Sequence, residues 1–285
     1  MRLNAPTLGT IVNWSLLPLV YLVILTAAVG AQAASSNCPG NPNALGVSRT
    51  IEIDATGGPR FGTLQYLTSV DLRPMEVVLT FDDGPKPKTT EAILDALDHH
   101  CVKATFFEVG KSIAAHPELT QEVLDRGQTV GSHSWSHPSD LDHLNLRKAT
   151  REIDLGFNVL RKDSGGRAAP FFRYPGLNDS AQLNRYLAER DVAIFSCDVI
   201  TDDWEGIAPS AIVARTLKRL GRKGKGIILL HDTKRATVSA LPVLLDELAR
   251  RGYRIVHIVP KPTDAEIGFS APQSAEENSI AHINH

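Results

Sequence analysis

The sequence has little excess charge of either sign. Its 285 residues include 30 lysines and arginines against 32 aspartates and glutamates, which gives a formal net charge of −2, and it contains no basic block. Nucleic acid is therefore not an expected partner, because its recognition needs clustered positive charge. With 42% hydrophobic and 22% charged residues, the composition excludes a disordered protein and is typical of one large globular domain or two small ones.

Cysteine is scarce, with only Cys38, Cys101 and Cys197 in the chain. Three scattered cysteines provide no thiolate metal site, and in an oxidising compartment they form at most one disulfide. Cys197 ends the apolar strand pattern of residues 192–197, which predicts a packed core thiol. The predicted bridge is therefore Cys38 to Cys101, which would tie the Pro/Asn/Gly-rich segment around Cys38 to the main domain. Three free buried thiols are the alternative.

Charged residues are almost absent from the first 33 positions, where Arg2 is the only one. An apolar run covers residues 16–29, and Ala31-Gln32-Ala33 follows it. A basic start, an apolar middle and a small-residue end predict a secretory signal peptide over residues 1–33, and hence a secreted or periplasmic protein. A permanent amino-terminal membrane anchor is the alternative. Without such an anchor, no stable membrane partner is expected.

The rest of the chain divides into three parts by its pattern. Residues 34–75 form an N-terminal arm, residues 76–260 a single main domain, and residues 261–285 a polar tail without periodicity, which predicts disorder. In the main domain, apolar runs alternate seven times with amphipathic segments. The strands are predicted at 77–81, 104–107, 128–133, 171–173, 192–197, 227–230 and 254–258, and the helices at 90–99, 117–127, 148–161, around 183–187, and at 210–220 and 238–251.

This alternation predicts parallel strands covered by helices, as in a (β/α) barrel or an open doubly wound sheet. Polar residues follow five of the predicted strands at their carboxyl ends: Asp82 and Asp83, His133 and His137, Arg173, Asp198, and His231. A barrel gathers such ends on one rim, whereas an open sheet spreads them along an edge. We therefore expect an α/β fold, a distorted (β/α)7-8 barrel with a gap beside its first and last strands.

Two adjacent carboxylates, Asp82 and Asp83, end the apolar run of residues 77–81 and precede a Gly-Pro turn. Successive side chains of an extended chain point to opposite sides, so the two are expected to differ in role. One metal ligand and one proton acceptor is the natural assignment. An ordinary Asp-Gly turn after a strand is the alternative.

A second group of polar residues is the segment His133-Ser134-Trp135-Ser136-His137. Two histidines at positions i and i+4 face the same way if the segment takes one helical turn, and neutral imidazoles are ligands for zinc and similar ions. Alone, such a pair is more often two surface histidines. Beside a strand end that carries carboxylates, two His and one Asp would leave a coordination position for water, as expected of a catalytic metal.

Five segments together resemble the ordered motifs of the polysaccharide deacetylase family, the carbohydrate esterases that share the NodB homology domain. They are Thr80-Phe81-Asp82-Asp83-Gly84-Pro85, His133-Ser-Trp-Ser-His137, Arg173-Tyr174-Pro175-Gly176, Asp198 to Trp204, and Leu229-Leu230-His231. The resemblance covers residues 75–260 and implies a distorted barrel. It also implies metal-dependent removal of N-acetyl groups, and in some members O-acetyl groups, from sugars such as those of chitooligosaccharides, peptidoglycan or xylan.

The resemblance also implies a role for each residue of these motifs. Asp83, His133 and His137 would hold a divalent metal, most commonly Zn²⁺, with Co²⁺ or another divalent ion as the alternative. Asp82 would be the general base and His231 the acid that protonates the departing amine. Arg173 would orient the base carboxylate, and Asp198 would set the protonation of His231. Substrate contacts are expected from Tyr174, Pro175, Gly176, Trp204 and Leu229.

Two motifs depart from the family pattern. Gly176 follows Pro175 directly where the family has an aromatic residue; the backbone N–H that would stabilise the oxyanion remains, and the aromatic wall does not. In the fourth motif, Asp198 stands five residues before Asp203, whereas the family spacing is Asp-x-x-Asp-Trp. Asp198, at a strand end, is the favoured partner of His231, and a local bulge is the alternative. Trp204 is either a packed loop residue or a platform of the acetyl pocket.

We expect a secreted metal-dependent deacetylase that acts on the N-acetyl groups of an N-acetylglucosamine-containing polysaccharide, either chitooligosaccharide or peptidoglycan. An O-acetyl esterase and a small-amide amidohydrolase are the enzymatic alternatives. A glycosidase would need two carboxylates on either side of a sugar, which the adjacent Asp82 and Asp83 do not provide. A non-catalytic carbohydrate-binding protein would tolerate loss of the base or the acid, whereas this chain has a candidate for each.

Overall fold

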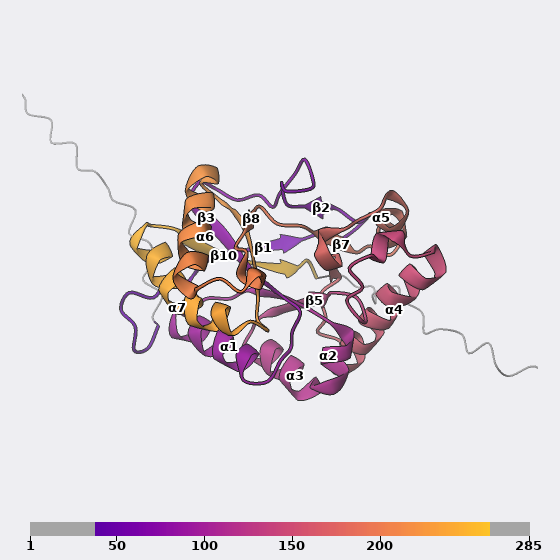
Figure 1. Cartoon of the computed structure of the whole chain (residues 1–285), viewed down its shortest axis with the longest axis horizontal. Helices are drawn as coiled ribbons and strands as arrows, with labels where there is room; N and C mark the ends of the chain where they lie inside the picture. Colours follow the sequence, from indigo (N-terminus) through magenta and orange to yellow (C-terminus); the bar gives the residue numbers. More distant parts are fainter. Residues whose placement is uncertain (1–37, 263–285) are drawn as a thin grey trace, which may run out of the picture. The chain divides into compact units, whose positions relative to one another are not determined.

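The computed structural model describes residues 38–262 of the chain (Figure 1). The predicted signal peptide lies outside the described residues, and so does the predicted disordered tail apart from residues 261 and 262. In the part of the chain that the structure describes, no helix is both long and apolar enough to span a bilayer.

Parallel strands form the framework of the protein, and each recorded pair of neighbouring strands is parallel. The strands are β1 (Val47–Ile53), β2 (Arg60–Phe61), β3 (Glu76–Asp82), β4 (Thr105–Glu108), β5 (Thr129–Ser132), β6 (Phe171–Phe172), β7 (Ala193–Phe195), β8 (Val199–Ile200), β9 (Gly226–His231) and β10 (Arg254–Pro260).

Strand β3 lies in the middle of this sheet, and all seven of its residues are buried. The order runs from β3 through β4, β5, β6 and β7 to β2 on one side, and through β9 to β8 on the other. Among the described strands, β2 pairs only with β7 and β8 only with β9, so the ring stays open between β2 and β8. The predicted distorted (β/α) barrel is confirmed.

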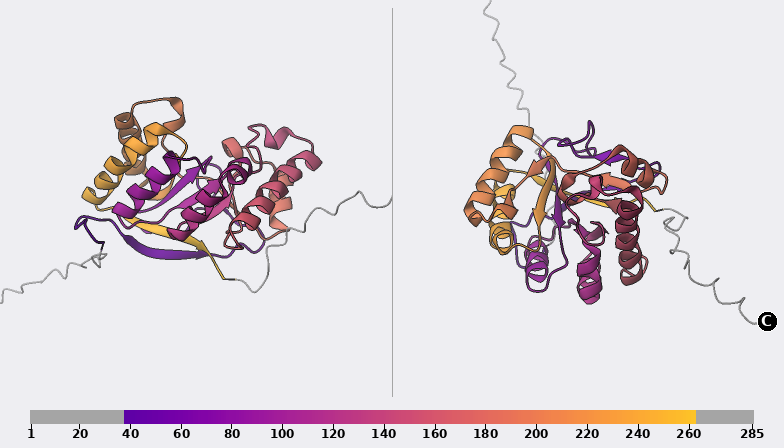
Figure 2. Two further views of the ribbon diagram at one scale, coloured as in Figure 1. Left: turned by 90° about the horizontal axis from the view of Figure 1, so that it is seen from below. Right: turned by 45° about the vertical axis from the view of Figure 1, so that its right-hand side comes forward.

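The gap was expected in the wrong place. The first and last strands of the predicted series are β3 and β10, and they do pair, at Glu76 with Arg254 and at Val77 with Ile255. Beyond these two residue pairs, β10 leaves β3 and follows β1. Figure 2 shows β1 (indigo) and β10 (gold) running together, on the side of the strands away from the helices in its left view.

Seven α-helices of the described chain cover the outer side of the strands (Figures 1 and 2). They are α1 (Thr89–His99), α2 (Gly110–Ala115), α3 (Pro117–Asp125), α4 (Leu146–Asp163), α5 (Ala181–Ala188), α6 (Pro209–Lys223) and α7 (Arg235–Arg250), with short 3-10 turns η1 (Leu141–His143), η2 (Pro175–Leu177) and η3 (Asp203–Glu205). Proline is the first residue of α3 and α6, where its missing N–H costs no helical hydrogen bond.

The alternation of side chains along β3 decides which residues reach the centre of the barrel. Val77, Leu79 and Phe81 pack against the helices, in one core cluster with Ile93 and other helix residues. Val78 belongs to a second cluster inside the barrel. Since side chains two residues apart face the same side, Asp82 points inward with Val78. The buried strand therefore carries a carboxylate on the inner face at its carboxyl end.

The N-terminal arm of residues 34–75 contributes two strands to the sheet, which its sequence pattern did not predict. Its strand β1 pairs with β10 over most of its length, and its strand β2 pairs with β7. The predicted disulfide between Cys38 and Cys101 is present, with a Cα–Cα distance of 5.8 Å, and Cys197 is a buried free thiol. The arm is thus fixed to the barrel both covalently and by main-chain hydrogen bonds.

Candidate active site

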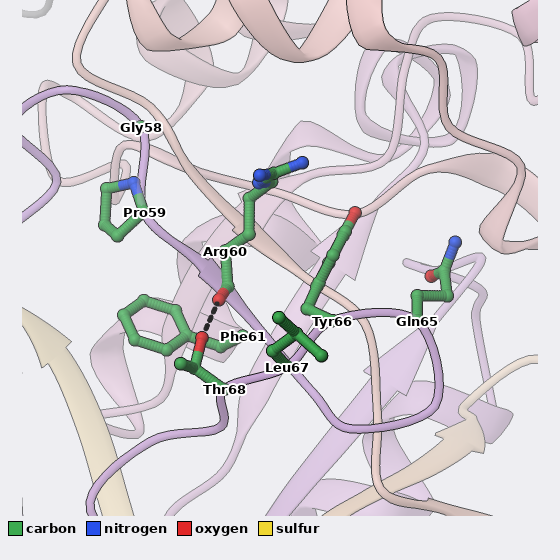
Figure 3. A pocket seen from close by; sticks show the side chains of 8 residues that line it. All are labelled: Gly58, Pro59, Arg60, Phe61, Gln65, Tyr66, Leu67 and Thr68. Atoms are coloured by element: carbon green, nitrogen blue, oxygen red, sulfur yellow. Dashed lines mark hydrogen bonds between the residues drawn. The ribbon is translucent and has the colours of Figure 1, made fainter.

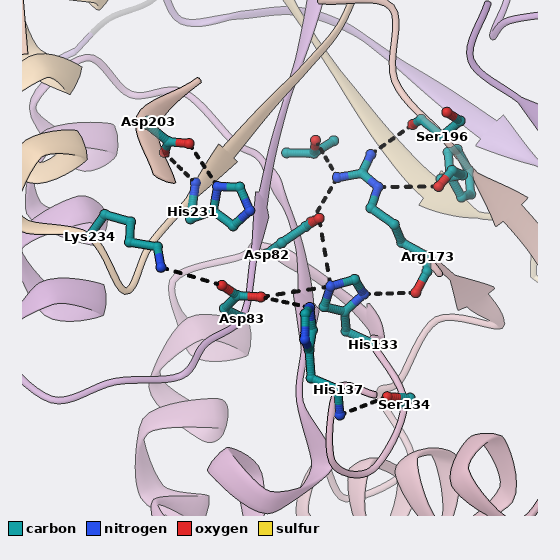
Figure 4. A network of polar contacts seen from close by, with 12 residues as sticks. Asp82, Asp83, His133, Ser134, His137, Arg173, Ser196, Asp203, His231 and Lys234 are labelled. Carbon is teal, nitrogen blue, oxygen red and sulfur yellow. Dashed lines mark hydrogen bonds and ion pairs between the residues drawn. The ribbon is translucent and has the colours of Figure 1, made fainter. Parts of the chain in front are cut away.

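Asp83, His133 and His137 converge at the carboxyl end of β3 and β5. The Nε2 atom of His137 lies 3.3 Å from Asp83 Oδ1, and the Nε2 atom of His133 lies 3.8 Å from the same oxygen. One ligand atom from each of the three residues lies within 4.8 Å of the others. Figure 4 shows the three side chains pointing at one another.

A tight turn brings the two histidines together, and not the helical turn that the sequence suggested. Ser134 and His137 have positive φ angles of 65° and 57°, and the backbone N–H of His137 donates to Ser134 Oγ at 3.1 Å. The turn rests on Gly110, whose N–H donates to Ser134 O at 2.9 Å. A Cβ at Gly110 would lie 2.7 Å from the ring of Trp135, so only glycine fits there.

The protonation of His133 follows from its neighbours. Its Nδ1 lies 2.7 Å from the backbone carbonyl of Arg173, which can only accept, so Nδ1 carries the hydrogen and Nε2 faces Asp83 with its lone pair. Burial lowers the pKa of His133, which favours the neutral form that binds metals.

The donor set fits a divalent cation. Asp83 Oδ1 is buried and has no hydrogen-bond partner, although a buried carboxylate oxygen is normally paired. Asp83 also adopts a left-handed φ of 78°, which is uncommon for a residue other than glycine and turns its side chain away from the direction of Asp82. Two neutral imidazoles and one carboxylate are the ligands expected of a catalytic zinc-type site.

Asp82 faces a different partner, as the alternation of side chains along the strand predicted. Its Oδ1 accepts a hydrogen bond from Arg173 at 2.7 Å, while its Oδ2 lies 3.8 Å from His133 Nε2. The guanidinium of Arg173 is fully buried and also donates to Thr80 Oγ1 and to the carbonyls of Phe195 and Ser196. These bonds fix the carboxylate of Asp82 beside the three candidate ligands.

Asp203, and not Asp198, pairs with His231. Asp203 Oδ1 lies 2.7 Å from His231 Nδ1, and Oδ2 accepts from the backbone N–H of His231 at 2.8 Å and from Thr237 at 2.5 Å. Burial lowers the pKa of His231, but the hydrogen bond and charge of Asp203 raise it, and the net shift is upward. Figure 4 shows Asp82 between this pair and Arg173.

Asp198 holds the arm against the barrel. Its carboxylate accepts hydrogen bonds from the N–H and hydroxyl of Thr63, the hydroxyl of Ser69 and the N–H of Ile227, all at 2.6–2.7 Å. After Asp198 the chain continues into the short strand β8. The carboxylate that reaches His231 is therefore Asp203, which follows β8, and not Asp198, which follows the predicted strand of residues 192–197. The sequence feature that identifies Asp203 is its position directly before Trp204, because the fourth motif of the family ends in Asp-Trp.

The expected substrate residues divide into two groups. Trp204 is 45% exposed and its ring lies edge-on to His231, with 5.4 Å between ring centroids, while Gly176 is exposed in η2 with a φ of 61°. The side chain of Tyr174 is only 2% exposed and its hydroxyl donates to Asn184, so the expected contact of this side chain with substrate is wrong. Leu229 lies in the interior cluster, on the same strand face as His231 and one layer deeper.

Lys234 is a residue at the site that the sequence analysis did not identify. Its Nζ lies 4.0 Å from Asp83 Oδ2, on the side of the carboxylate away from the histidines. Nothing in the local pattern distinguishes Lys234 from other lysines near a strand end. Pro175, which was expected, is buried at the start of η2.

Comparison with known proteins supports the resemblance to the polysaccharide deacetylase family. A sequence model of the polysaccharide deacetylase family matches residues 69–194. A peptidoglycan-N-acetylmuramic acid deacetylase of Bacillus subtilis is 36% identical over 67% of this chain and 39% of its own length. A peptidoglycan-N-acetylglucosamine deacetylase of Bacillus cereus is 32% identical over 67% of this chain and 70% of its own length.

A solved structure gives the same result. The peptidoglycan deacetylase Bd3279 of Bdellovibrio bacteriovorus superimposes with a TM-score of 0.69 at 32% identity, over 77% of this chain and 61% of that one. The chain therefore belongs to the polysaccharide deacetylase family, and its fold is the distorted barrel of these enzymes. It spans about two fifths of the length of the first relative that it matches.

Proposed function

We propose that this protein is a metal-dependent hydrolase that removes N-acetyl groups from an N-acetylglucosamine-containing polysaccharide, either peptidoglycan or a chitooligosaccharide. One observation carries the proposal: the candidate ligands Asp83, His133 and His137 lie beside Asp82, whose carboxylate is held by Arg173, and the residue opposite Asp82 on the neighbouring strand is His231, which is held by Asp203. A base and an acid beside a Lewis-acid site are what amide hydrolysis requires.

Asp82 is the general base of the proposed reaction. A bound divalent ion, most commonly Zn²⁺, would lower the pKa of water and polarise the acetyl carbonyl. Asp82 accepts the proton of the attacking water as the new carbon–oxygen bond forms. Arg173 keeps the Asp82 carboxylate in position through its 2.7 Å hydrogen bond, and its own burial and bonds prevent it from moving away.

His231 is the proposed general acid. When the carbon–nitrogen bond breaks, the amine of the sugar leaves only if it receives a proton. The pKa of His231 is raised by Asp203, against the opposing effect of burial, so the imidazolium persists near neutral pH and can donate from Nε2. Acetate and the free amine are the products. The backbone N–H of Gly176, after Pro175, is the proposed hydrogen-bond donor to the oxyanion.

Export by the segment of residues 1–33 is part of the same proposal. The Cys38–Cys101 disulfide supports it, because such bonds persist in oxidising compartments and are rare in the cytosol. Relatives of Bacillus species are named for peptidoglycan sugars, and a relative of Bradyrhizobium is named a chitooligosaccharide deacetylase. Both polymers carry N-acetyl groups, so these names support an acetylated glycan as the substrate.

The proposal is tested by acetate release from peptidoglycan, chitooligosaccharides and acetylxylan in parallel, with and without a chelator. We expect release from at least one of the two N-acetylated glycans and its loss on chelation. Release from acetylxylan alone would make the protein an O-acetyl esterase. No release from any of the three, by protein loaded with a divalent metal, would contradict the proposal.

A further inference from the structure

A cavity of about 550 Å³ lies outside the group of catalytic candidates, at β2 and the loop that follows it. Its lining is contributed by Gly58, Pro59, Arg60, Phe61, Gln65, Tyr66, Leu67 and Thr68 (Figure 3). The volume is within the range of pockets that bind small ligands. These residues precede position 69, where the match to the family model begins, so the family comparison assigns them no role.

The cavity adjoins the active-site rim. Strand β2 is parallel to β7, so the loop after Phe61 emerges on the same rim as the site residues. The side chain of Gln65 donates to the carbonyl of Leu177, and the hydroxyl of Tyr66 donates to Asp179 at 3.1 Å. Both acceptors follow the Pro175–Gly176 turn. Strand β2 is two strands away from β6, the strand that precedes Arg173. The distance between β2 and β6 across the sheet is therefore about 10 Å.

The lining of the cavity combines the positively charged side chain of Arg60 with an exposed apolar side chain, Leu67. Within the described residues, Arg60 makes no ion pair, and its guanidinium lies 5.4 Å from the ring centre of Tyr66. The nearby carboxylate of Asp179 is already occupied by Tyr66 and Asn184. Leu67 is fully exposed and Leu64 is 47% exposed. Figure 3 shows Arg60 and Tyr66 extending in the same direction from the loop, with Leu67 at the base of Tyr66.

We propose that this cavity is a subsite for a carboxylate-bearing sugar of the glycan chain, next to the unit that is deacetylated. Arg60 binds the carboxylate, because a guanidinium forms charge-assisted hydrogen bonds with that group. Leu67 contacts the apolar face of the sugar. The inference rests on the proposed function and makes it more specific, since every second sugar of a peptidoglycan chain carries a lactyl group with a carboxylate or a peptide, and the sugars of chitooligosaccharides carry none.

The test compares Arg60→Ala with the wild type on an acidic peptidoglycan oligosaccharide and on a neutral chitooligosaccharide of the same length. We expect KM for the acidic substrate to rise about 10-fold, with kcat unchanged and both constants for the neutral substrate unchanged. Arg250→Ala is the control, because it removes an exposed arginine from the end of α7, on the opposite rim. Equal KM values for both proteins, or equal losses on both substrates, would overturn the subsite.

A second variant, Leu67→Asp, places a negative charge in the cavity without disturbing the core, since this side chain is fully exposed. It should raise KM more for the acidic substrate than for the neutral one, because both lose the apolar contact and only the acidic one meets a like charge. Equal KM changes on the two substrates, or no change on either, would overturn the subsite. Calorimetric binding of the acidic oligosaccharide separates the two proposals. If binding depends on Arg60 while no acetate is released, the proposed function fails and the subsite stands. If acetate is released and binding is independent of Arg60, only the subsite fails.

Discussion

Asp82 and Asp83 are adjacent in the chain, yet they face different partners. Asp82 accepts from Arg173, and Asp83 faces the two histidines because its backbone turns into the left-handed region. A single residue step in an extended strand reverses the direction of the side chain, and the turn after the strand completes the separation. The two carboxylates are therefore expected to respond differently to the same substitution.

The first prediction concerns this pair. Asp82→Asn should retain the metal and lose about 10²–10⁴ in kcat, because it removes the proton acceptor alone. Asp83→Asn should lower metal occupancy, since an amide is a weaker ligand than a carboxylate. Elemental analysis and acetate release measured on the same samples distinguish the two. Loss of metal from Asp82→Asn with retention in Asp83→Asn would exchange the roles.

The second prediction concerns the acid. Asp203 raises the pKa of His231, with Asp82 and Asp83 contributing in the same direction, so Asp203→Asn should lower that pKa. The protonated form is then lost at lower pH, and the alkaline limb of the kcat–pH profile on an N-acetyl sugar should move to lower pH. An aryl acetate, whose leaving group needs no proton, should show no such shift. An unchanged profile on the sugar would mean that His231 is not the acid.

At the residue scale, the residues that the sequence groups in contiguous motifs also lie together in the structure. Asp83, His133 and His137 could be predicted as a group because each follows a strong strand signal, and parallel strands end on one rim. Asp203 could not, because the strand before it, Val199–Ile200, has only two residues and is too short to show a periodic pattern. Lys234 was missed for a different reason: only the folded loop after His231 brings it within 4.0 Å of Asp83.

At the scale of elements, the strongly apolar strands and the longer helices were predicted, and the two strands of the N-terminal arm, β1 and β2, were not. Strand β1 alternates partly buried and exposed residues, because it lies at one end of the strand order and pairs only with β10. Strand β2 has two residues. Neither gives a periodic signal that distinguishes it from a loop, so their places in the sheet come from long-range pairing that local patterns do not encode.

The third prediction concerns the bridge between arm and barrel. Asp198→Ala removes a buried carboxylate that accepts four hydrogen bonds, so the free energy of unfolding should fall by about 2–4 kcal/mol. Turnover of an N-acetyl sugar per folded molecule should remain unchanged, because Asp198 does not contact His231. Urea unfolding and initial rates measure the two effects. A large loss of turnover with normal stability would return Asp198 to the catalytic group.

At the scale of the whole molecule, a single disulfide joins the beginning of the described chain to the barrel. The bridge joins two residues that are 63 positions apart in the sequence, and the segment between them includes β1, β2 and β3. Cross-linking of so long a segment reduces the conformational freedom of the unfolded chain. The arm, which carries the cavity of residues 58–68, is thereby kept against the barrel.

The fourth prediction follows from this constraint. Replacement of both Cys38 and Cys101 by serine should lower the free energy of unfolding by about 2–4 kcal/mol, measured by urea denaturation. A reductant should weaken the wild type by a similar amount and leave the double variant unaffected, which makes the variant its own control. If the double variant is as stable as the wild type, hydrogen bonds alone hold the arm.

We propose that one divalent ion, held by Asp83, His133 and His137, is required for deacetylation. The most direct measurement removes metal from the purified protein with a chelator and restores Zn²⁺ stepwise, recording bound metal and acetate release from an N-acetylated glycan at each step. We predict that the rate is lost on removal and rises in proportion to occupancy, reaching its maximum at one ion per chain. A rate that survives removal of the metal, or that is unrelated to occupancy, would contradict the account.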